Sequence, residues 1–338
     1  MAVRIKDIAR LAKVSEATVS LALNNKSIVR EETRKRIQAL AAELGFSPNA
    51  MARGLVQQKS RTIGLIVPDI ENLYYAKLVK HVDERVREAG LALIMAISDD
   101  KPEVESKIVD SFISERVEGV LVVPVNQVNK DTGYFEKLKK HDIPCVCVTS
   151  YYAGSDLPYV MTDIEEGMYK LTGYLLDMGH REIYFLCGAL NVLTTSLRVG
   201  GYTKAFAARD LAVDGRKFIE CRNLNYEGAQ EEAIRLLREK VKMDAVIAIN
   251  DFMAVGFLNI LKESGIRVPG DISLAGFDNT VFSSIAGIPL TTVSQDIRRM
   301  GVNSVEMLLK RIEKGDSGFE NMVIKPELII RESTMKKK

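Results

Sequence analysis

The chain has 338 residues, of which 46% are hydrophobic, and a formal net charge of +2. This length exceeds that of one small domain, so we expect two or three folded units. The start, Met1-Ala2-Val3-Arg4, leads into no apolar signal segment, and no apolar run is long enough to span a bilayer. These observations argue against a secreted or membrane-embedded protein, and we predict a cytoplasmic one.

The charge is unevenly distributed along the chain. Residues 1–61 hold 12 Lys and Arg against 5 Asp and Glu, a net +7, whereas the remainder holds 35 against 40, a net −5. A basic head followed by a mildly acidic body predicts a polyanionic partner for the head.

The first 45 residues predict three short helices. Their apolar residues recur at the spacing of one helix face; they are Ile5, Ile8, Ala9 and Ala12, then Val19, Ala22 and Leu23, then Ile37, Leu40, Ala41 and Leu44. Ser15 can cap the second helix, and Gly45 can end the third. A tight turn between the first two helices fits a helix-turn-helix, although an ordinary three-helix bundle would show the same pattern.

The next segment predicts a short helix that needs a partner. Ser47 and Pro48 form a capping residue followed by a first-turn proline, and residues 49–56 can continue as about two turns. Gly54 weakens such a helix by roughly 1 kcal/mol, so we expect it to order only against a partner, such as DNA and a twin copy of itself. Leu55 would then be an apolar wedge for the minor groove; alternatively, it covers the junction with the next domain.

From Thr62 onward, short apolar runs alternate with amphipathic helices. The apolar runs predict buried strands in two series. The first series is Ile63–Val67, Leu91–Ile97, Gly119–Val123 and Pro144–Val148. The second series is Tyr159–Thr162, Ile183–Cys187, Phe218–Cys221, Ala245–Ile249 and Ser273–Phe277. The helices between them fall near 73–89, 102–116 and 132–140, then 165–178, 197–209, 227–239 and 252–264. Such alternation implies parallel sheets with helices on both faces. Two similar series predict two lobes with a cleft between them.

Metal and catalytic motifs are not found in the sequence. The four cysteines lie in apolar, strand-like contexts without zinc spacing, so buried reduced thiols are expected; they are Cys145, Cys147, Cys187 and Cys221. The three histidines are scattered, and G-x-S-x-G, H-E-x-x-H and Walker sequences are absent. We therefore expect no metal, no cofactor and no enzymatic activity. A hydrolase would need two cleft carboxylates at a working separation, which nothing in the sequence establishes.

Three stretches together resemble the lactose-repressor-like (LacI/GalR) family of bacterial transcription regulators. They are I-K-D-I-A-R-L-A-K-V-S-E-A-T-V-S from Ile5, S-P-N-A-M-A-R-G-L from Ser47, and S-R-T-I-G-L-I-V-P-D-I from Ser60. The resemblance covers essentially the whole chain. It implies an all-α helix-turn-helix head, joined by a hinge helix to an α/β two-lobed body of the type I periplasmic-binding-protein-like fold.

The resemblance also implies a domain plan and a partner. The head would be residues 1–46, the hinge and linker 47–61, and the effector-binding and dimerisation domain 62–338. Lobe one would comprise about 62–161 plus 294–324, and lobe two 162–293 plus 325–338, with crossings near 160, 292 and 325. A homodimer would place the second helix of each head in a major groove of operator DNA. Base-reading candidates are Glu16, Ala17 and Leu21, with hinge contacts from Asn49, Ala52 and Leu55, and phosphate contacts near Ser15, Thr18, Ser20, Asn24 and Arg34.

Polar residues follow several predicted strands, where open α/β sheets bind ligands. By position they match effector contacts of the family; they are Tyr74, Tyr75, Asp163, Thr194, Arg198, Asn250 and Asp278. Asp163 and Asn250 could instead be helix caps. Arg198 and Asp278 can grip ring hydroxyls with charge-assisted hydrogen bonds. A sugar or sugar derivative is therefore the expected effector.

Some positions depart from the family pattern. Leu21 stands where many members have Arg, so the operator is expected to differ from the usual one. Arg30 stands where many have Ser, which removes a cap. Asn223 replaces an aromatic residue that stacks on the ligand in several relatives, and Tyr226 could take its place. A repressor relieved by an inducer and one that needs a purine or protein corepressor both remain open. Lys336-Lys337-Lys338 is expected to be a solvated end.

Overall fold

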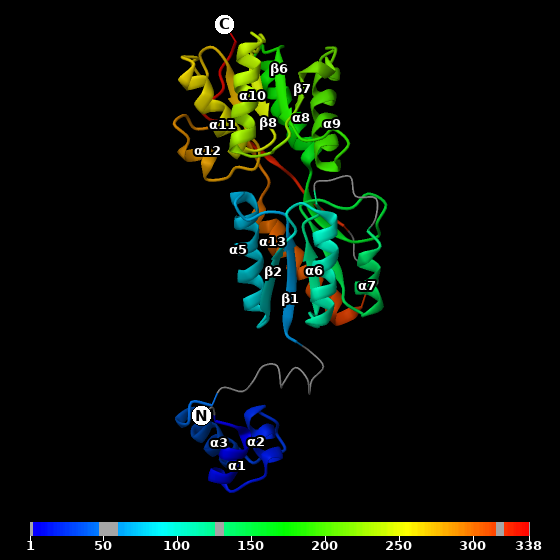
Figure 1. Cartoon of the computed structure of the whole chain (residues 1–338), viewed down its shortest axis with the longest axis vertical. Coiled ribbons are helices and arrows are strands. Elements are labelled where there is room, and N and C mark those ends of the chain that lie inside the picture. Colours follow the sequence, from blue (N-terminus) through cyan, green and yellow to red (C-terminus); the bar gives the residue numbers. More distant parts are fainter. Residues whose placement is uncertain (1–2, 47–59, 126–131, 316–320, 338) are drawn as a thin grey trace. The chain divides into compact units, whose positions relative to one another are not determined.

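A computed structural model describes residues 3–46, 60–125, 132–315 and 321–337. The chain divides into two compact units, Met1–Ser60 and Arg61–Lys338. The first unit is the small helical head at the N-terminus, and the second is the α/β body (Figure 1). Each unit is considered by itself below.

The head contains three helices around one small core. Its helices are α1 (Ile5–Ala12), α2 (Glu16–Leu23) and α3 (Glu31–Glu43). One residue from each helix is fully buried at the centre, namely Ile8, Val19 and Ile37. The predicted apolar stripes therefore face one another, as the spacing indicated.

Local backbone signals set the ends of these helices. Lys13 takes the left-handed conformation, with φ of 54°, and ends α1. The Ser15 Oγ accepts the Thr18 N–H at 3.1 Å and begins α2 only three residues beyond α1. Gly45 follows α3 with φ of 62°, where the lack of a Cβ removes the steric penalty. The tight turn and both predicted signals, Ser15 and Gly45, are confirmed.

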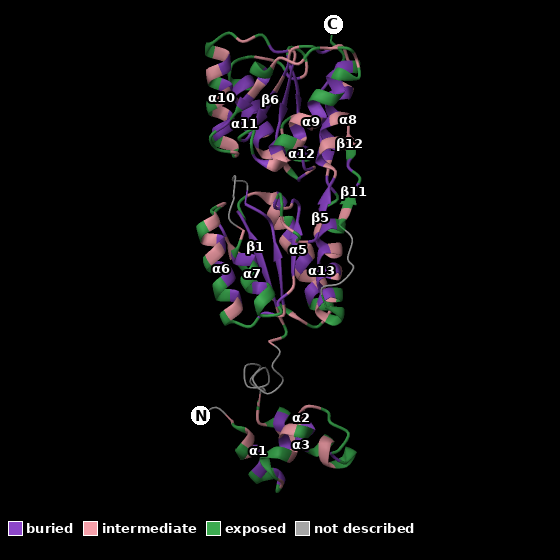
Figure 2. Ribbon diagram, turned by 90° about the vertical axis from the view of Figure 1, so that its right-hand side faces the viewer, coloured by how far each residue is buried: buried purple, intermediate pink, exposed green. Residues whose placement is uncertain are grey.

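The half of the body that we call lobe one is a six-stranded parallel sheet with helices on both faces. Its strand order is β11-β5-β4-β3-β1-β2. The strands are β1 (Thr62–Val67), β2 (Ala92–Ile97), β3 (Gly119–Val122), β4 (Cys145–Val148), β5 (Tyr159–Thr162) and β11 (Met322–Ile324). The helices α5 (Leu73–Glu88) and α13 (Ile297–Lys314) cover one face, and α6 (Pro102–Ser114) and α7 (Tyr134–Lys140) cover the other (Figure 2).

The other half, lobe two, is a four-stranded parallel sheet in the order β7-β6-β8-β9. Its strands are β6 (Ile183–Cys187), β7 (Phe218–Glu220), β8 (Ala245–Ala248) and β9 (Ser273–Ala275). The helices are α8 (Ile164–Asp177), α9 (Leu193–Ala207), the short 3-10 helix η1 (Gly215–Lys217), α10 (Tyr226–Arg238), α11 (Asp251–Glu263) and α12 (Phe282–Ile285). One continuous apolar core joins the sheet to α8, α9, α10 and α11. Parallel strands with their carboxyl ends at one edge place the loops that follow them together.

The chain passes between the lobes three times. The first crossing leads from β5 to α8, and the second from β10 (Thr292–Ser294) to α13. The third leads from β11, in the sheet of lobe one, to β12 (Glu327–Ile329), which pairs antiparallel with β10. The crossings therefore lie near residues 163, 295 and 325, and they bring three separate segments together between the lobes.

One expectation from the sequence is wrong, and two short elements were not expected. Strand β2 was expected to be buried, yet Ile94 and Met95 are each 39% exposed because β2 is an edge strand. Neither α12 nor β12 was expected, since each is too short to show a period. Of the terminal lysines, Lys336 and Lys337 are exposed as expected, and the Lys337 Nζ also lies 2.5 Å from the Asp244 Oδ2.

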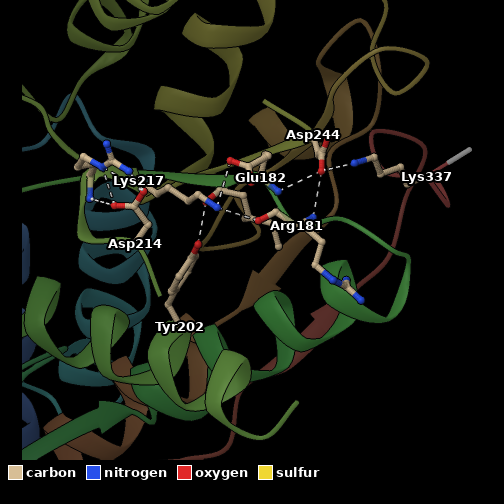
Figure 3. Close-up of polar contacts among 9 residues, drawn as sticks. Arg181, Glu182, Tyr202, Asp214, Lys217, Asp244 and Lys337 are labelled. Carbon is tan, nitrogen blue, oxygen red and sulfur yellow. Dashed lines mark hydrogen bonds and ion pairs between the residues drawn. The ribbon is translucent and has the colours of Figure 1, made fainter. Parts of the chain in front are cut away.

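Asp244 fixes the C-terminal tail to lobe two (Figure 3). Besides Lys337, its Oδ2 accepts the backbone N–H groups of Arg181 and Glu182, each at 3.0 Å. The neighbouring Lys217 Nζ donates to the Arg181 carbonyl at 3.0 Å and pairs with Glu182 at 3.2 Å. The Asp244 carboxylate, just before β8, thus holds together the residues that precede β6 and the C-terminal tail.

No helix in the described part of the chain is long and apolar enough to cross a membrane.

Candidate functional site

The outward face of α2 carries three side chains of different chemistry. Glu16 and Ala17 are exposed and Leu21 is 38% exposed, whereas Val19 and Ala22 on the opposite face are fully buried. A carboxylate, a methyl group and a branched apolar side chain can each contact the edges of bases in a major groove. The structure therefore leaves the three predicted base-reading residues free of the head's own core.

The polar residues around α2 make local contacts. The Ser15 and Thr18 hydroxyls lie 2.9 Å apart, and the Asn24 Nδ2 donates to the Ser20 carbonyl at 2.9 Å. Arg34 is partly exposed on α3. Their phosphate contacts stay a prediction, and the predicted hinge contacts, Asn49, Ala52 and Leu55, lie outside the described residues.

The start of α3 carries Arg30, one of the departures from the family pattern noted in the sequence. Arg30 occupies the N-cap position and its side chain makes no capping hydrogen bond, so the expected loss of a cap is confirmed. Just before it, Ile28 is 80% exposed, which the sequence analysis did not single out. The region between α2 and α3 thus presents both a cation and an apolar side chain to solvent.

The body holds a cavity of about 710 Å³ between its two lobes. Six of the seven predicted effector residues line it, and they are Tyr74, Tyr75, Thr194, Arg198, Asn250 and Asp278. They come from α5 in lobe one and from α9, the start of α11 and the segment after β9 in lobe two. The two predicted series of strands therefore bring their ends to one space, of a size typical for small-molecule sites.

Arg198 carries a buried positive charge into this cavity. Its side chain is only 7% exposed, its Nη1 donates to the Thr194 carbonyl at 3.1 Å, and its guanidinium lies 4.5 Å from the centre of the Phe277 ring. Burial lowers the pKa of the guanidinium, although Asp278 opposes this shift. The Nε has no hydrogen-bond partner among the described residues, and an unmet buried donor is costly.

Asp278 supplies a buried carboxyl group to the same cavity. It is 6% exposed, and its backbone has φ of 103°, a conformation that is rare for a residue with a side chain. Burial raises the pKa of this carboxyl to about 8, helped by Asp251, while Arg198 and a hydrogen bond from Gln295 act against it. Arg198 and Asp278 line the same cavity, and each charge acts on the pKa of the other, although no salt bridge between them is found among the described residues.

Asp163 and Asn250 do what helix caps do. The Asp163 Oδ1 accepts the Glu166 N–H at 2.9 Å, and Asp163 is not among the residues that line the cavity. Asn250 lines the cavity, but its Oδ1 accepts the Met253 N–H at 2.8 Å and its Nδ2 donates to the Leu224 carbonyl. For Asp163 the structure thus supports the capping alternative, and for Asn250 it supports both.

Several lining residues were not singled out as contacts. They include Asp100, Thr149, Ser150, Glu220, Arg222 and Gln295. Asp100, Thr149, Ser150 and Glu220 follow or end strands, so the strand-end argument could have found them. Asn223 lines the cavity, whereas Tyr226 does not, and the Tyr226 hydroxyl accepts from the Asn259 Nδ2 at 2.6 Å. The proposed substitution by Tyr226 therefore finds no support.

The described residues contain no group of three His, Cys, Asp or Glu that could hold a metal ion. All four cysteines are buried and free, as expected.

A helix-turn-helix head and a two-lobed body with a polar cavity between parallel sheets define a class of protein, the ligand-responsive DNA-binding regulators.

Comparison with known proteins identifies the family. Residues 4–49 match the model of bacterial regulatory proteins of the lacI family, and residues 172–334 match a periplasmic binding protein-like domain. The chain is 31% identical to catabolite control protein A of Priestia megaterium over 335 residues, 99% of this chain and 100% of that protein. It is 33% identical to the HTH-type transcriptional repressor PurR of Vibrio campbellii, with 98% of each chain covered. The chain therefore belongs to the LacI family and is a transcriptional regulator.

Solved structures agree with this assignment. The lac repressor dimer bound to operator and the anti-inducer ONPF matches with a TM-score of 0.87 and 25% identity, covering 99% of this chain and 100% of that one. A complex of the transcriptional regulator CelR with cellobiose matches with a TM-score of 0.74 and 25% identity, covering 98% and 99%. The predicted fold class and family are confirmed.

Proposed function

We propose that this regulator is a repressor whose operator affinity is set by a polar small molecule bound between the two lobes. The observation that carries the proposal is the pair Arg198 and Asp278. Both are buried and line one cavity, and the buried Arg198 Nε has no hydrogen-bond partner among the described residues. Buried polar groups normally have a partner, and a ligand with hydroxyl groups could bind the Arg198 guanidinium and the Asp278 carboxyl together.

The same proposal assigns the rest of the chain. Residues 1–46 would bind DNA through Glu16, Ala17 and Leu21, residues 47–61 would form the hinge, and residues 62–338 would bind the effector and a second copy. The lac repressor, to which the chain is similar, is described as a dimer on its operator. A cytoplasmic homodimer without enzymatic activity follows from this assignment. By linkage, operator DNA must change effector affinity by the same factor as effector changes operator affinity.

The effector we favour is a sugar or sugar derivative. Carboxylate, guanidinium and amide groups can bind adjacent hydroxyls in a fixed orientation, and a relative of similar fold is described with cellobiose. One observation favours a second candidate, a purine corepressor. Tyr74 and Tyr75 both line the cavity, with ring centres 5.2 Å apart, and an aromatic face can stack on a planar base. PurR proteins are among the relatives of the chain.

A thermal-shift screen of the full chain tests the cavity. The probes are cellobiose, D-ribose, glucose 6-phosphate and adenine. A probe present at 100 times its Kd stabilises by about 2.7 kcal/mol, which is a shift of several degrees for a body of this size. In Arg198→Ala the shift should disappear while far-UV circular dichroism stays unchanged.

Arg216→Ala is the matched control, because Arg216 is 90% exposed and bonds only Asp214 in the described structure. A full shift in Arg198→Ala would show that the ligand binds elsewhere. Selection from random duplexes tests the head separately. A failure to enrich any specific site at physiological salt, with or without the probes, would remove the assignment to operator DNA.

A further inference from the structure

Gln295 lies where the chain crosses from lobe two into lobe one. It sits between β10 and α13, is only 3% exposed, and lines the cavity. Sequence reasoning gave it no role. A buried amide has two donor hydrogens and an acceptor oxygen to satisfy, so the partners of Gln295 show what it holds together.

Three contacts join Gln295 to three other segments. The Nε2 donates to the Asp278 Oδ1 at 2.5 Å, and the Oε1 accepts the Tyr74 hydroxyl at 3.4 Å. Its backbone carbonyl accepts the hydroxyl of Thr162, at the end of β5, at 2.7 Å. Asp278 belongs to lobe two, Tyr74 opens α5 of lobe one, and Thr162 lies at the first crossing. One side chain therefore connects a ligand-facing carboxylate of one lobe to a ligand-facing phenol of the other.

The backbone around this amide gives it little room to move. The Asp278 N–H donates to the Val293 carbonyl at 2.8 Å, which holds Asp278 beside β10 despite its positive φ. Conformations of this kind persist only where surrounding contacts impose them. Since β10 leads directly to Gln295, the carboxylate and the amide are held by the same short segment.

We propose that Gln295 is a positioning residue that aims the Asp278 carboxylate into the cavity and links it to Tyr74, so that the two lobes keep their ligand-free arrangement. This inference rests on the proposed function, because it concerns the regulation of the same cavity. A ligand that takes the Asp278 oxygen from Gln295 breaks the link at one end. The change in contact at Asp278 is thereby passed to the start of α5 in lobe one.

Replacement of the amide by a carboxylate gives a specific signature. In Gln295→Glu two carboxylates would face each other, and such a pair shares one proton at lower pH and repels when both are charged. The charged and titratable groups facing this position are Arg198 from α9, Asp251 from α11, and Tyr75 beside Tyr74 from α5. In this variant the contact between residue 295 and Asp278 should therefore be kept at pH 6 and lost at pH 9.

The experiment is hydrogen exchange of the ligand-free full chain, followed by mass spectrometry. The peptides of interest contain Tyr74 and Asp278, and rates are corrected for intrinsic exchange at each pH. In Gln295→Glu we expect both peptides to exchange at least tenfold faster than in the unmodified protein at pH 9, and at nearly its rate at pH 6. In Gln295→Met, which has no donor for Asp278 and only a weakly accepting sulfur, exchange of both should rise at both pH values.

Gln230→Glu, on α10 and not among the residues that line the cavity, is the control for an added carboxylate and should change neither peptide. Unchanged exchange at Tyr74 in both Gln295 variants would overturn the proposal. So would a rise in Gln295→Glu that is equal at both pH values, since a merely structural role predicts that result. Because no ligand is present, this outcome is independent of the thermal-shift screen.

Discussion

A buried carboxyl group in lobe one predicts how stability depends on pH. Glu105, on α6, is fully buried and accepts the hydroxyls of Tyr134 and Tyr152 with its Oε1. Its Oε2 has no hydrogen-bond partner in the part of the chain that the structure describes. Burial raises the pKa of this carboxyl to about 7, against the lowering effect of the two hydroxyls. The folded protein therefore favours the protonated form.

The sign of the effect follows from proton linkage. The unfolded chain releases the Glu105 proton near pH 4.5, whereas the folded protein retains it to about pH 7. Between these values the folded state binds more protons, so the free energy of unfolding decreases as pH rises. The loss is absent below pH 4.5 and complete above pH 7. A difference of about 2.5 pKa units corresponds to roughly 3 kcal/mol.

Glu105→Gln removes this titration while keeping an oxygen for the two hydroxyls. We expect its free energy of unfolding, relative to the unmodified protein, to rise by about 2 to 3 kcal/mol from pH 5 to pH 8.5. The assay is urea denaturation followed by far-UV circular dichroism at several pH values. Asp251 and Asp278 have raised pKa values too, but they are present in both proteins and cancel in the comparison. Glu103→Gln, exposed on the same helix, is the control, and equal pH slopes for Glu105→Gln and the unmodified protein would refute the reasoning.

Two further predictions concern the head and the packing of lobe two. Leu21→Arg should shift operator preference toward guanine by about 1 to 3 kcal/mol, because arginine can make a bidentate contact that leucine cannot. Selection from random duplexes measures the preferred sequence. An unchanged consensus sequence would contradict base reading by Leu21. Gly201→Ala should destabilise by about 1 to 3 kcal/mol, since a Cβ there would lie 2.1 Å from the Glu165 carbonyl on α8. Gly215→Ala, with no atom within 4 Å of the new Cβ, should be near neutral in the same melting assay.

Most of the fold follows from local pattern. The alternation of apolar runs and amphipathic helices predicted strands β1 to β9 and the helices between them, because burial on both faces of a parallel sheet imposes continuous apolar strands. Exposure of β2 could not be predicted in this way. Its residues Ile94 and Met95 resemble those of a central strand, and only the strand order places them at an edge.

The candidate site likewise has residues that the sequence could predict and residues that it could not. Residues just after strands were predicted because sheet geometry gathers them, which is why Arg198 and Asp278 meet at one cavity. Gln295 was not predicted, because the crossings of the chain between the lobes bring it to its partners, Tyr74 and Asp278. Local periodicity does not encode these crossings. Glu105 could have been noticed, since it lies four residues before buried Val109 on the apolar stripe of α6.

The three crossings have a consequence for how the protein is made. Helix α13 and strand β11 complete lobe one, and residues 333–337 complete lobe two, where the Ser333 hydroxyl donates to the Leu274 carbonyl at 2.5 Å. Domains tend to fold as units while the ribosome delivers them from the N-terminus. Here the edge of β5 and the apolar sheet face beneath α13 stay uncovered until α13 and β11, close to the end of the chain, have emerged. A nascent chain stalled before α13 would leave both lobes unfinished, which makes that stage of synthesis the one most in need of a chaperone.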